Sequence, residues 1–308
     1  MNVIICGVVK NAAANLDNNL KLAMELGSKC ANYKIVIYEN NSSDTTKKIL
    51  SNYVKDEHFE IIMEDIDNAV IKRDSKIWAY TAVTGSDHSC RIEQISNARN
   101  KLIAEIKDTT KYADYNYVVM IDFDAKFFSP DGIINSLHLI KENRKRVVYA
   151  NSHDYYDYYA LRSPHSEYNL FGPELMGEFF WQNMNAKRLK INPESNELVP
   201  VYSAFNGIGV YDKDVFTAFQ YDALITPATK AVYKQIADLH PNAYAMLRPI
   251  LQQECSKFYG GESTPEFYWK NNSGYDKPVI CEHVAFNFAL VQAGYEIVIN
   301  PRMLYWWN

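Results

Sequence analysis

The chain has 308 residues, of which 47% are apolar, and it carries a formal net charge of −5 at pH 7. A chain of this length and apolar content can bury a sizeable core, so we expect a globular protein. The acidic balance argues against a nucleic-acid-binding protein, because such proteins gather Lys and Arg against the phosphates.

The first 63 residues alternate between apolar runs and segments with helical spacing. Apolar runs at residues 3–9, 34–38 and 58–63 are typical of buried strands. Helical spacing lies between them, at residues 15–26 and 45–53. This alternation predicts an α/β fold with a mostly parallel sheet flanked by helices, in which ligands bind at the carboxyl ends of the strands.

Short polar side chains follow the second of these strands, in the string from Glu39 to Asp44. Asn40 and Asp44 are candidates to hydrogen-bond the base or the ribose of a nucleotide. Asp44 also precedes the next helix, so an ordinary helix cap is the competing interpretation.

The strongest site signal is a pair of carboxylates directly after a strand. Residues 115–121 predict that strand, and it runs into Asp122-Phe123-Asp124. Two carboxylates at the end of a buried strand are costly unless they bind something. Mn²⁺ or Mg²⁺ takes few oxygen ligands from a protein and the others from water and substrate phosphates, so we predict that a metal ion and a diphosphate meet at Asp122 and Asp124.

Two further residues are candidates for the same site. Residues 64–90 show no clear periodicity, and residues 92–106 then predict a helix that carries Arg99. Its guanidinium could pair with a phosphate, and a surface ion pair is the competing interpretation. His283 precedes a helix predicted at residues 284–293 and could add an imidazole nitrogen to the metal ion, although a lone histidine is often structural.

The rest of the chain predicts a mixture of regular elements and long loops. Residues 151–200 are rich in Tyr, Asn, Pro and His with weak periodicity, which predicts inserted loops of the kind that often carry specificity. Around them we predict a helix at 132–142, strands at 147–150, 202–211 and 296–299, and helices within 217–254 that are interrupted near Pro227 and Pro241. We expect the aromatic tail, residues 303–307, to pack or to line the site, with contact to a membrane interface as the alternative.

No internal repeat or linker is visible, so we expect a single domain over residues 1–308. Residues 1–125 would form the nucleotide-sugar-binding half, and residues 126–308 the acceptor-binding half with inserted loops at about 151–200. The five cysteines are widely spaced and form no C-x-x-C pair, which favours a reducing compartment over a disulfide framework or a zinc site. Neither a signal peptide nor a membrane-spanning run is predicted, so we expect a cytoplasmic protein that is at most peripheral to a membrane.

A series of short motifs over residues 90–301 resembles the fungal capsule-associated α-1,3-mannosyltransferase family and related viral and bacterial sugar transferases. The motifs are, in order, Ala98-Arg99-Asn100, Ile121-Asp122-Phe123-Asp124, Ser203-Ala204-Phe205-Asn206-Gly207, Cys281-Glu282-His283 and Ile299-Asn300-Pro301. The resemblance implies a GT-A fold, a nucleotide-sugar donor, a metal ion held by Asp122 and Asp124, and retention of the anomeric configuration. We add Asn206 to the donor-binding set. Fungal members tend to have Trp where this chain has Phe205.

We therefore expect a metal-dependent glycosyltransferase that moves a sugar from GDP-mannose or a UDP-sugar to a hydroxyl acceptor, in particular a glycan. Glu282 and Asp154 are candidates to orient or deprotonate that hydroxyl. One alternative is a sugar nucleotidyltransferase, although residues 7–11 contain a single glycine and match a phosphate-binding loop poorly. The other alternative is a carbohydrate-binding protein that has the same fold without catalysis.

Overall fold

The computed structural model describes residues 1–77, 88–184, 189–259 and 279–307. Through these residues runs a nine-stranded sheet in the order β3-β2-β1-β4-β8-β6-β9-β5, and β7 pairs with β9 beside this path. Six of these strands, β1, β2, β3, β4, β6 and β9, point the same way, and β5, β7 and β8 oppose them. The structure thus confirms the predicted α/β class with a mostly parallel sheet flanked by helices.

The first part of the sheet follows the predicted alternation closely. Its elements are β1 (Asn2–Val9), α1 (Leu16–Ser28), β2 (Asn32–Asn40), α2 (Thr46–Ser51) and β3 (Phe59–Glu64). Both neighbours of β2 run parallel to it, because each connection crosses over the sheet through a helix. The carboxyl ends of these strands therefore lie at one edge, as expected.

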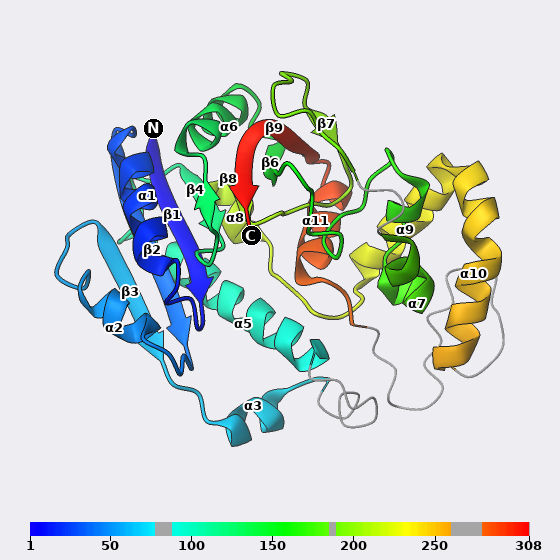
Figure 1. The fold of residues 1–308 in the computed structure, drawn as a ribbon, viewed down its shortest axis with the longest axis horizontal. Helices are drawn as coiled ribbons and strands as arrows, with labels where there is room; N and C mark the ends of the chain where they lie inside the picture. The colour runs from blue at the N-terminus through cyan, green and yellow to red at the C-terminus, as the bar shows by residue number, and fades with distance from the viewer. Residues whose placement is uncertain (78–87, 185–188, 260–278, 308) are drawn as a thin grey trace.

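Two hydrophobic cores lie on opposite faces of the sheet. Side chains along a strand alternate between the faces, so Ile4 and Cys6 of β1 belong to one core while Val3 and Ile5 belong to the other. The first core receives α5 (His88–Ile106), α9 (Pro227–Leu239) and α11 (Glu282–Gln292), and the second receives α1 and α6 (Pro130–Glu142). In Figure 1, α1 and α6 lie on one face of the sheet, and α5 and α11 lie on the opposite face.

The central strands come from both predicted halves of the chain. β4 (Tyr117–Ile121) is followed by β8 (Ile208–Asp212), β6 (Arg146–Asn151) and β9 (Glu296–Trp306), with β5 (Phe127–Phe128) and β7 (Val199–Pro200) as short neighbours of β9. The Ser129 hydroxyl caps α6 by accepting from the Gly132 N–H at 3.1 Å, and Pro130 occupies its first turn, as the sequence predicts. The remaining helices are α3 (Asn68–Asp74), α7 (Pro173–Met184), α8 (Lys213–Ala218) and α10 (Pro241–Tyr259), with a 3-10 turn, η1 (Glu167–Asn169).

The structure corrects the predicted loops at residues 64–90 and 151–200. The first region contains α3, which is capped by Asp67, and the second contains α7. A buried ion pair between Arg162 and Glu174, at 2.8 Å, fixes the start of α7. Such a long-range anchor leaves no periodicity in the sequence, which explains the wrong prediction.

Two strand boundaries also differ from the predictions. β8 begins at Ile208 rather than at residue 202, because Asn206 and Gly207 adopt positive φ angles of 53° and 85° that end an extended strand. β9 continues seven residues beyond the predicted end at 299, through Pro301, because β5 pairs with its last residues. Pro227 and Pro241 begin α9 and α10 as predicted.

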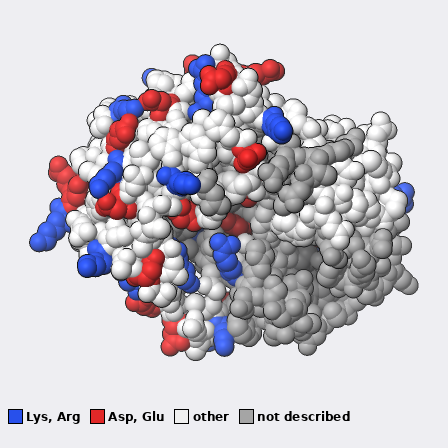
Figure 2. Space-filling model, in the orientation of Figure 1, with Lys and Arg blue, Asp and Glu red and all other residues white. Residues whose placement is uncertain are grey.

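Across the parts of the chain that the structure describes, none of the helices combines the length and the apolar character needed to cross a bilayer. On the face shown in Figure 2, Lys and Arg side chains are interspersed with Asp and Glu rather than gathered into a basic patch.

Candidate active site

A cavity of about 680 Å³ lies at the carboxyl ends of β1, β2 and β4. Residues 8–12 and Asn40 contribute the strand-end side of its lining, and α3 and α5 contribute another side. Asp122 and Asp124, which follow β4, complete the lining. The cavity therefore lies where a parallel sheet is expected to bind its ligand.

Asp122 is a perturbed acidic group of this cavity. Its backbone N–H donates to the Gly207 carbonyl at 2.9 Å, which fixes the turn after β4 against the turn before β8. Burial raises the pKa of its carboxyl to about 7, with Arg99 opposing the shift and Asp124, Asp157 and Glu282 adding to it. Burial likewise raises the pKa of Asp124. The charged forms of both carboxylates are therefore disfavoured mainly because they are withdrawn from water.

Arg99 links the acidic strand end to the start of α11. Its guanidinium donates to Asp122 Oδ1 at 3.1 Å and to Glu282 Oε1, and it is only 3% exposed. It also lies 5.1 Å from the centroid of the Phe205 ring and 5.5 Å from that of Tyr221. The structure thus brings together three predicted site residues, Arg99, Asp122 and Glu282, from elements that are far apart in the sequence.

A second arginine on α5 lines the same cavity. Arg91 is exposed, and its positive charge lowers the pKa of Asp124. The sequence analysis did not select it. Its position eight residues before Arg99 on one helix, close to the same helical face, is the signal that could have identified it.

Asp157 is an acidic site residue that the sequence analysis missed. Its Oδ2 accepts from the Asn206 N–H at 3.1 Å, and its Oδ1 accepts from the Ala160 N–H at 3.3 Å. Burial raises its pKa to about 6, and the negative charge of Glu282 adds to the shift. The predicted candidate Asp154 lies three residues earlier with an exposed side chain. A carboxylate inside the run Tyr155-Tyr156-Asp157-Tyr158-Tyr159 could have indicated a buried position.

His283 and Asn206 are buried close to these carboxylates. The His283 ring stacks on Phe205 with 3.7 Å between centroids, and burial lowers its pKa well below the usual value, with Arg99 adding to the effect. Neither its Nδ1 nor its Nε2, nor either polar atom of the Asn206 side chain, has a hydrogen-bond partner among the described residues. Buried polar atoms are normally bonded, so these groups are suited to a ligand.

The described residues do not by themselves form a complete metal site. Among residues 1–77, 88–184, 189–259 and 279–307, no three His, Cys, Asp or Glu side chains are placed to hold an ion together. The residues still fit a divalent cation in their chemistry, since Asp122 and Asp124 have raised pKa values and His283 has two unpartnered nitrogens.

The structure separates the two predicted residues of the polar string. Asn40 lines the cavity. Asp44 instead accepts from the Thr46 N–H at 2.9 Å and from the Ala13 N–H at 3.1 Å. Asp44 thus bonds to the first turn of α2, but it lies one residue before the cap position, which is Thr45, and its role in donor binding stays a prediction.

The aromatic tail packs into the sheet and lines the site. Tyr305 lies in β9 with its hydroxyl 3.2 Å from the Asp122 carbonyl and 3.4 Å from Asp124 Oδ1. Gly207 makes this approach possible, because a Cβ there would lie 2.4 Å from the Tyr305 ring. The expectation that the tail packs or lines the site is confirmed for Tyr305.

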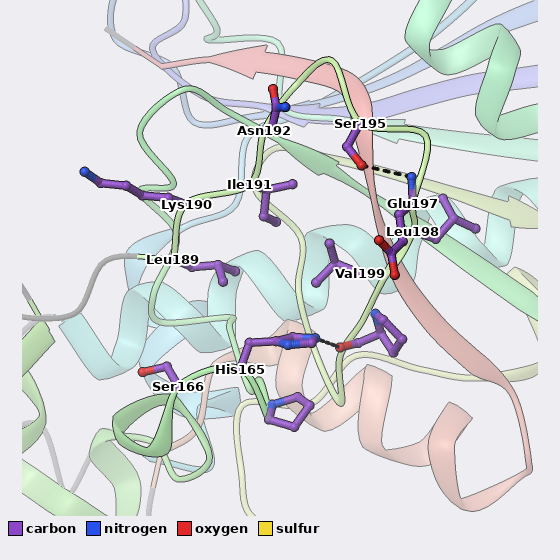
Figure 3. Close-up of a pocket in the computed structure, with 12 residues that line it drawn as sticks. His165, Ser166, Leu189, Lys190, Ile191, Asn192, Ser195, Glu197, Leu198 and Val199 are labelled. Carbon is purple, nitrogen blue, oxygen red and sulfur yellow. Dashed lines mark hydrogen bonds between the residues drawn. The ribbon is translucent and has the colours of Figure 1, made fainter.

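A second cavity, of about 790 Å³, lies among residues 164–166 and 189–200 and shares no lining residue with the first (Figure 3). The His165 ring hydrogen-bonds to the Pro200 carbonyl at 3.1 Å, and the Ser195 hydroxyl accepts from the Glu197 N–H at 3.0 Å. Both bonds join residues of the cavity wall to one another. None of the predicted site residues lines it.

Comparisons with known proteins give one family match. A family model described as Cryptococcal mannosyltransferase 1 matches residues 8–252. No curated protein matches the chain in sequence.

Several solved structures resemble this fold at low sequence identity. The mannosyltransferase PcManGT from Pyrobaculum calidifontis, in complex with GDP-Man and Mn²⁺, has a TM-score of 0.45 and 11% identity over 98% of this chain and 55% of its own. S. aureus TarS has a TM-score of 0.40 and 10% identity over 72% of this chain and 30% of its own. TarS 1-349 in complex with UDP-GlcNAc has a TM-score of 0.40 and 8% identity over 99% of this chain and 57% of its own. The chain thus spans less than two thirds of each of these proteins.

Proposed function

This chain belongs to the Cryptococcal mannosyltransferase 1 family, and from that membership we propose that it transfers a sugar from a nucleoside-diphosphate sugar to a glycan hydroxyl with the help of a divalent metal ion. Membership of the family makes it a glycosyltransferase. The observation that carries the finer proposal is the cavity at the strand ends, which joins Asn40, Arg91, Arg99, Asp122 and Asp124 in one space.

The donor occupies this cavity in our proposal. A volume of about 680 Å³ lies within the range of small-molecule sites. Asn40, with Asp44 as the less supported candidate, would contact the base or the ribose, and Asn206 completes the predicted donor set. Arg91 and Arg99 would face the diphosphate. The family description favours GDP-mannose as the donor, with a UDP-sugar as the alternative.

We assign the metal ion, Mn²⁺ or Mg²⁺, to Asp122 and Asp124, with His283 as a further ligand. Four carboxylates, Asp122, Asp124, Asp157 and Glu282, influence one another here, and the buried cation among them is Arg99. Burial is the main cause of the raised pKa values of Asp122 and Asp124, and a divalent cation would favour their charged forms; an imidazole ligand favours Mn²⁺ over Mg²⁺. When bound, the ion supplies charge neutralisation for the departing nucleoside diphosphate.

The acceptor would approach from the side of Asp157. Glu282 is buried against Arg99, so we propose that it positions this guanidinium rather than deprotonating the acceptor. Asp157 and the exposed Asp154 are the two carboxylates available to orient the hydroxyl, and the bonds of Asp157 to the Asn206 turn favour Asp157. If configuration is retained, as the resemblance implies, an oxygen of the leaving diphosphate can take the acceptor proton and no side-chain base is required.

A donor-hydrolysis assay tests this proposal. The full chain would be incubated with Mn²⁺ and a panel of GDP- and UDP-sugars, with a chelator-treated sample as the control. Release of the nucleoside diphosphate from one donor, lost on chelation, supports the transferase. Release of pyrophosphate from a nucleoside triphosphate and a sugar phosphate would instead identify a nucleotidyltransferase. If no product forms from any of these substrates, the carbohydrate-binding alternative is favoured.

A further inference from the structure

The last residues of β9 place three aromatic rings on alternating sides of the strand. Tyr305 and Trp307 point to one face and Trp306 to the other, because side chains alternate along a strand. Tyr305 is fully buried, whereas Trp307 is 41% exposed. The strand therefore leads one row of rings from the interior to the surface.

Tyr156 continues this row on a loop that follows β6. Its ring stacks on Tyr305 with 6.1 Å between centroids and 24° between planes, and on Trp307 with 5.7 Å and 23°. The three rings are thus nearly parallel, and we name this row, Tyr305, Tyr156 and Trp307, the aromatic row. Tyr156 is half-buried, so its outer end and Trp307 are open to solvent.

The aromatic row begins at the candidate reaction centre. The Tyr305 hydroxyl contacts Asp124 Oδ1 at 3.4 Å. Burial raises the pKa of the Tyr156 hydroxyl well above its usual value, and the negative charges of Asp157, Asp122 and Asp124 add to the shift, so Tyr156 lies within the field of the same carboxylates. Tyr156 also directly precedes Asp157 in the chain. A ligand resting on the row would therefore extend from the proposed acceptor position toward solvent.

We propose that Tyr156 and Trp307 form a binding subsite for a sugar ring of the acceptor glycan, one or more residues away from the hydroxyl that receives the transferred sugar. This inference rests on the proposed function and adds that the acceptor is an oligosaccharide rather than a single sugar. Tyr156 supports the Trp307 ring by stacking on it, and the exposed part of Trp307 offers an aromatic face to the C–H face of a pyranose ring, while the Tyr156 hydroxyl and the Trp307 N–H can bond to its polar edge.

The surroundings favour a glycan over a lipid surface. The exposed Asp154 lies on the same loop as Tyr156, and the row leads to Asp122 and Asp124. Acidic groups beside the rings repel the anionic lipids that attract peripheral proteins. Uncharged sugar hydroxyls pay no such penalty.

A second group of rings on the opposite face of β9 provides a matched control. Trp306 contacts Phe127 at 5.0 Å and His153 at 5.5 Å between centroids. Phe127 is 40% exposed, almost the same as Trp307, but its ring packs against Trp306 rather than against the aromatic row. Phe127→Ala therefore removes an equally exposed aromatic side chain outside the proposed subsite.

The test measures binding of the full chain to an array of mono- and oligosaccharides. We expect the wild-type chain to retain at least one oligosaccharide, Trp307→Ala to bind it roughly ten-fold more weakly, and Phe127→Ala to bind it as the wild type does. Trp307→Phe should keep most of the binding and Trp307→Leu should lose it, because the contact needs an aromatic face and not only an apolar one. Circular dichroism of each variant confirms that it is folded.

Three results would overturn the inference. They are an array on which no oligosaccharide binds, equal losses in Trp307→Ala and Phe127→Ala, and Trp307-dependent binding to phosphatidylserine vesicles in place of glycans. Donor hydrolysis by the wild-type chain is measured separately. If the chain hydrolyses a donor but binds no oligosaccharide on the array, the proposed function is supported and this subsite is refuted. If Trp307-dependent glycan binding occurs without donor hydrolysis, sugar binding at these rings is supported and the proposed function is refuted.

Discussion

On the proposed donor side of the site, Asn40 and Asp122 stand at the ends of parallel strands, and Arg91 stands on the helix that covers them. On the proposed acceptor side, Asp157 lies in a loop and Asn206 in a turn, and Tyr305 lies on a strand from the far end of the chain. The donor side follows from a repeated local pattern. The acceptor side depends on contacts between segments more than 40 residues apart in the sequence.

Arg99 joins these two sides, because it pairs with Asp122 on one and with Glu282 on the other. In the proposed function, the parallel strands and their covering helix would position the donor, while separately anchored loops and the end of β9 would position the acceptor. Variants on either side should then affect different properties of the protein.

The largest expected effect is on the donor side. Asp124→Asn removes a charged ligand from the proposed metal site, and transfer should fall by about 10²–10³-fold or more, since electrostatic stabilisation of the leaving group is lost. Initial rates at saturating donor and Mn²⁺ measure this loss, and the thermal midpoint should stay close to that of the wild type. Asp131→Asn, an exposed acidic residue at the start of α6, is the control. Equal rates in both variants would refute the metal assignment.

The next effect concerns the junction between the two sides. Arg99→Met leaves Asp122 and Glu282 without their buried cation and should lower the free energy of unfolding by about 3–5 kcal/mol. Arg144 pairs with Asp212 at 2.6 Å, but its side chain is 65% exposed. Arg144→Met should therefore cost no more than about 1 kcal/mol. Denaturant unfolding of both variants measures the difference, and similar losses would show that Arg99 acts as an ordinary surface residue.

The smallest expected effect is on the acceptor side and depends on pH. The folded pKa of Asp157, about 6, lies above its usual value of 3.8, so the native state holds its proton more tightly than the unfolded state. This contribution to stability is fully present below pH 4 and is lost as the pH rises through 6. Relative to Asp157→Asn, the wild type should therefore lose roughly 1–3 kcal/mol of unfolding free energy between pH 4 and pH 7.

Urea unfolding at a series of pH values measures this difference. The same series with Asp154→Asn is the control, because this variant removes a nearby negative charge without changing the carboxyl of Asp157. A pH-dependent difference of the same size and direction in Asp154→Asn would show that Asp157 has no special place in the site.

The sequence alone determined the sheet and the acidic end of the donor cavity. Residues 3–9, 35–38 and 117–121 form continuous apolar runs, which favour strands covered on both faces, and Asp122 and Asp124 follow directly from the end of the last one. These inferences succeed because the spacing of side chains along a strand or a helix is a local property of the chain. Arg99 and His283 were selected from the same reasoning; the structure places Arg99 against Asp122 and stacks His283 on Phe205, and their roles stay predictions.

Only the tertiary structure decided which residues complete the site. It brought Asp157 against the Asn206 backbone, held Asp44 against the Ala13 backbone, and extended β9 through Pro301 so that Tyr305 reaches Asp124. Each of these outcomes depends on a contact between distant segments, such as the pairing of β5 with the end of β9. A sequence pattern records which face a side chain prefers, but the partner it meets there is set by how the whole chain packs.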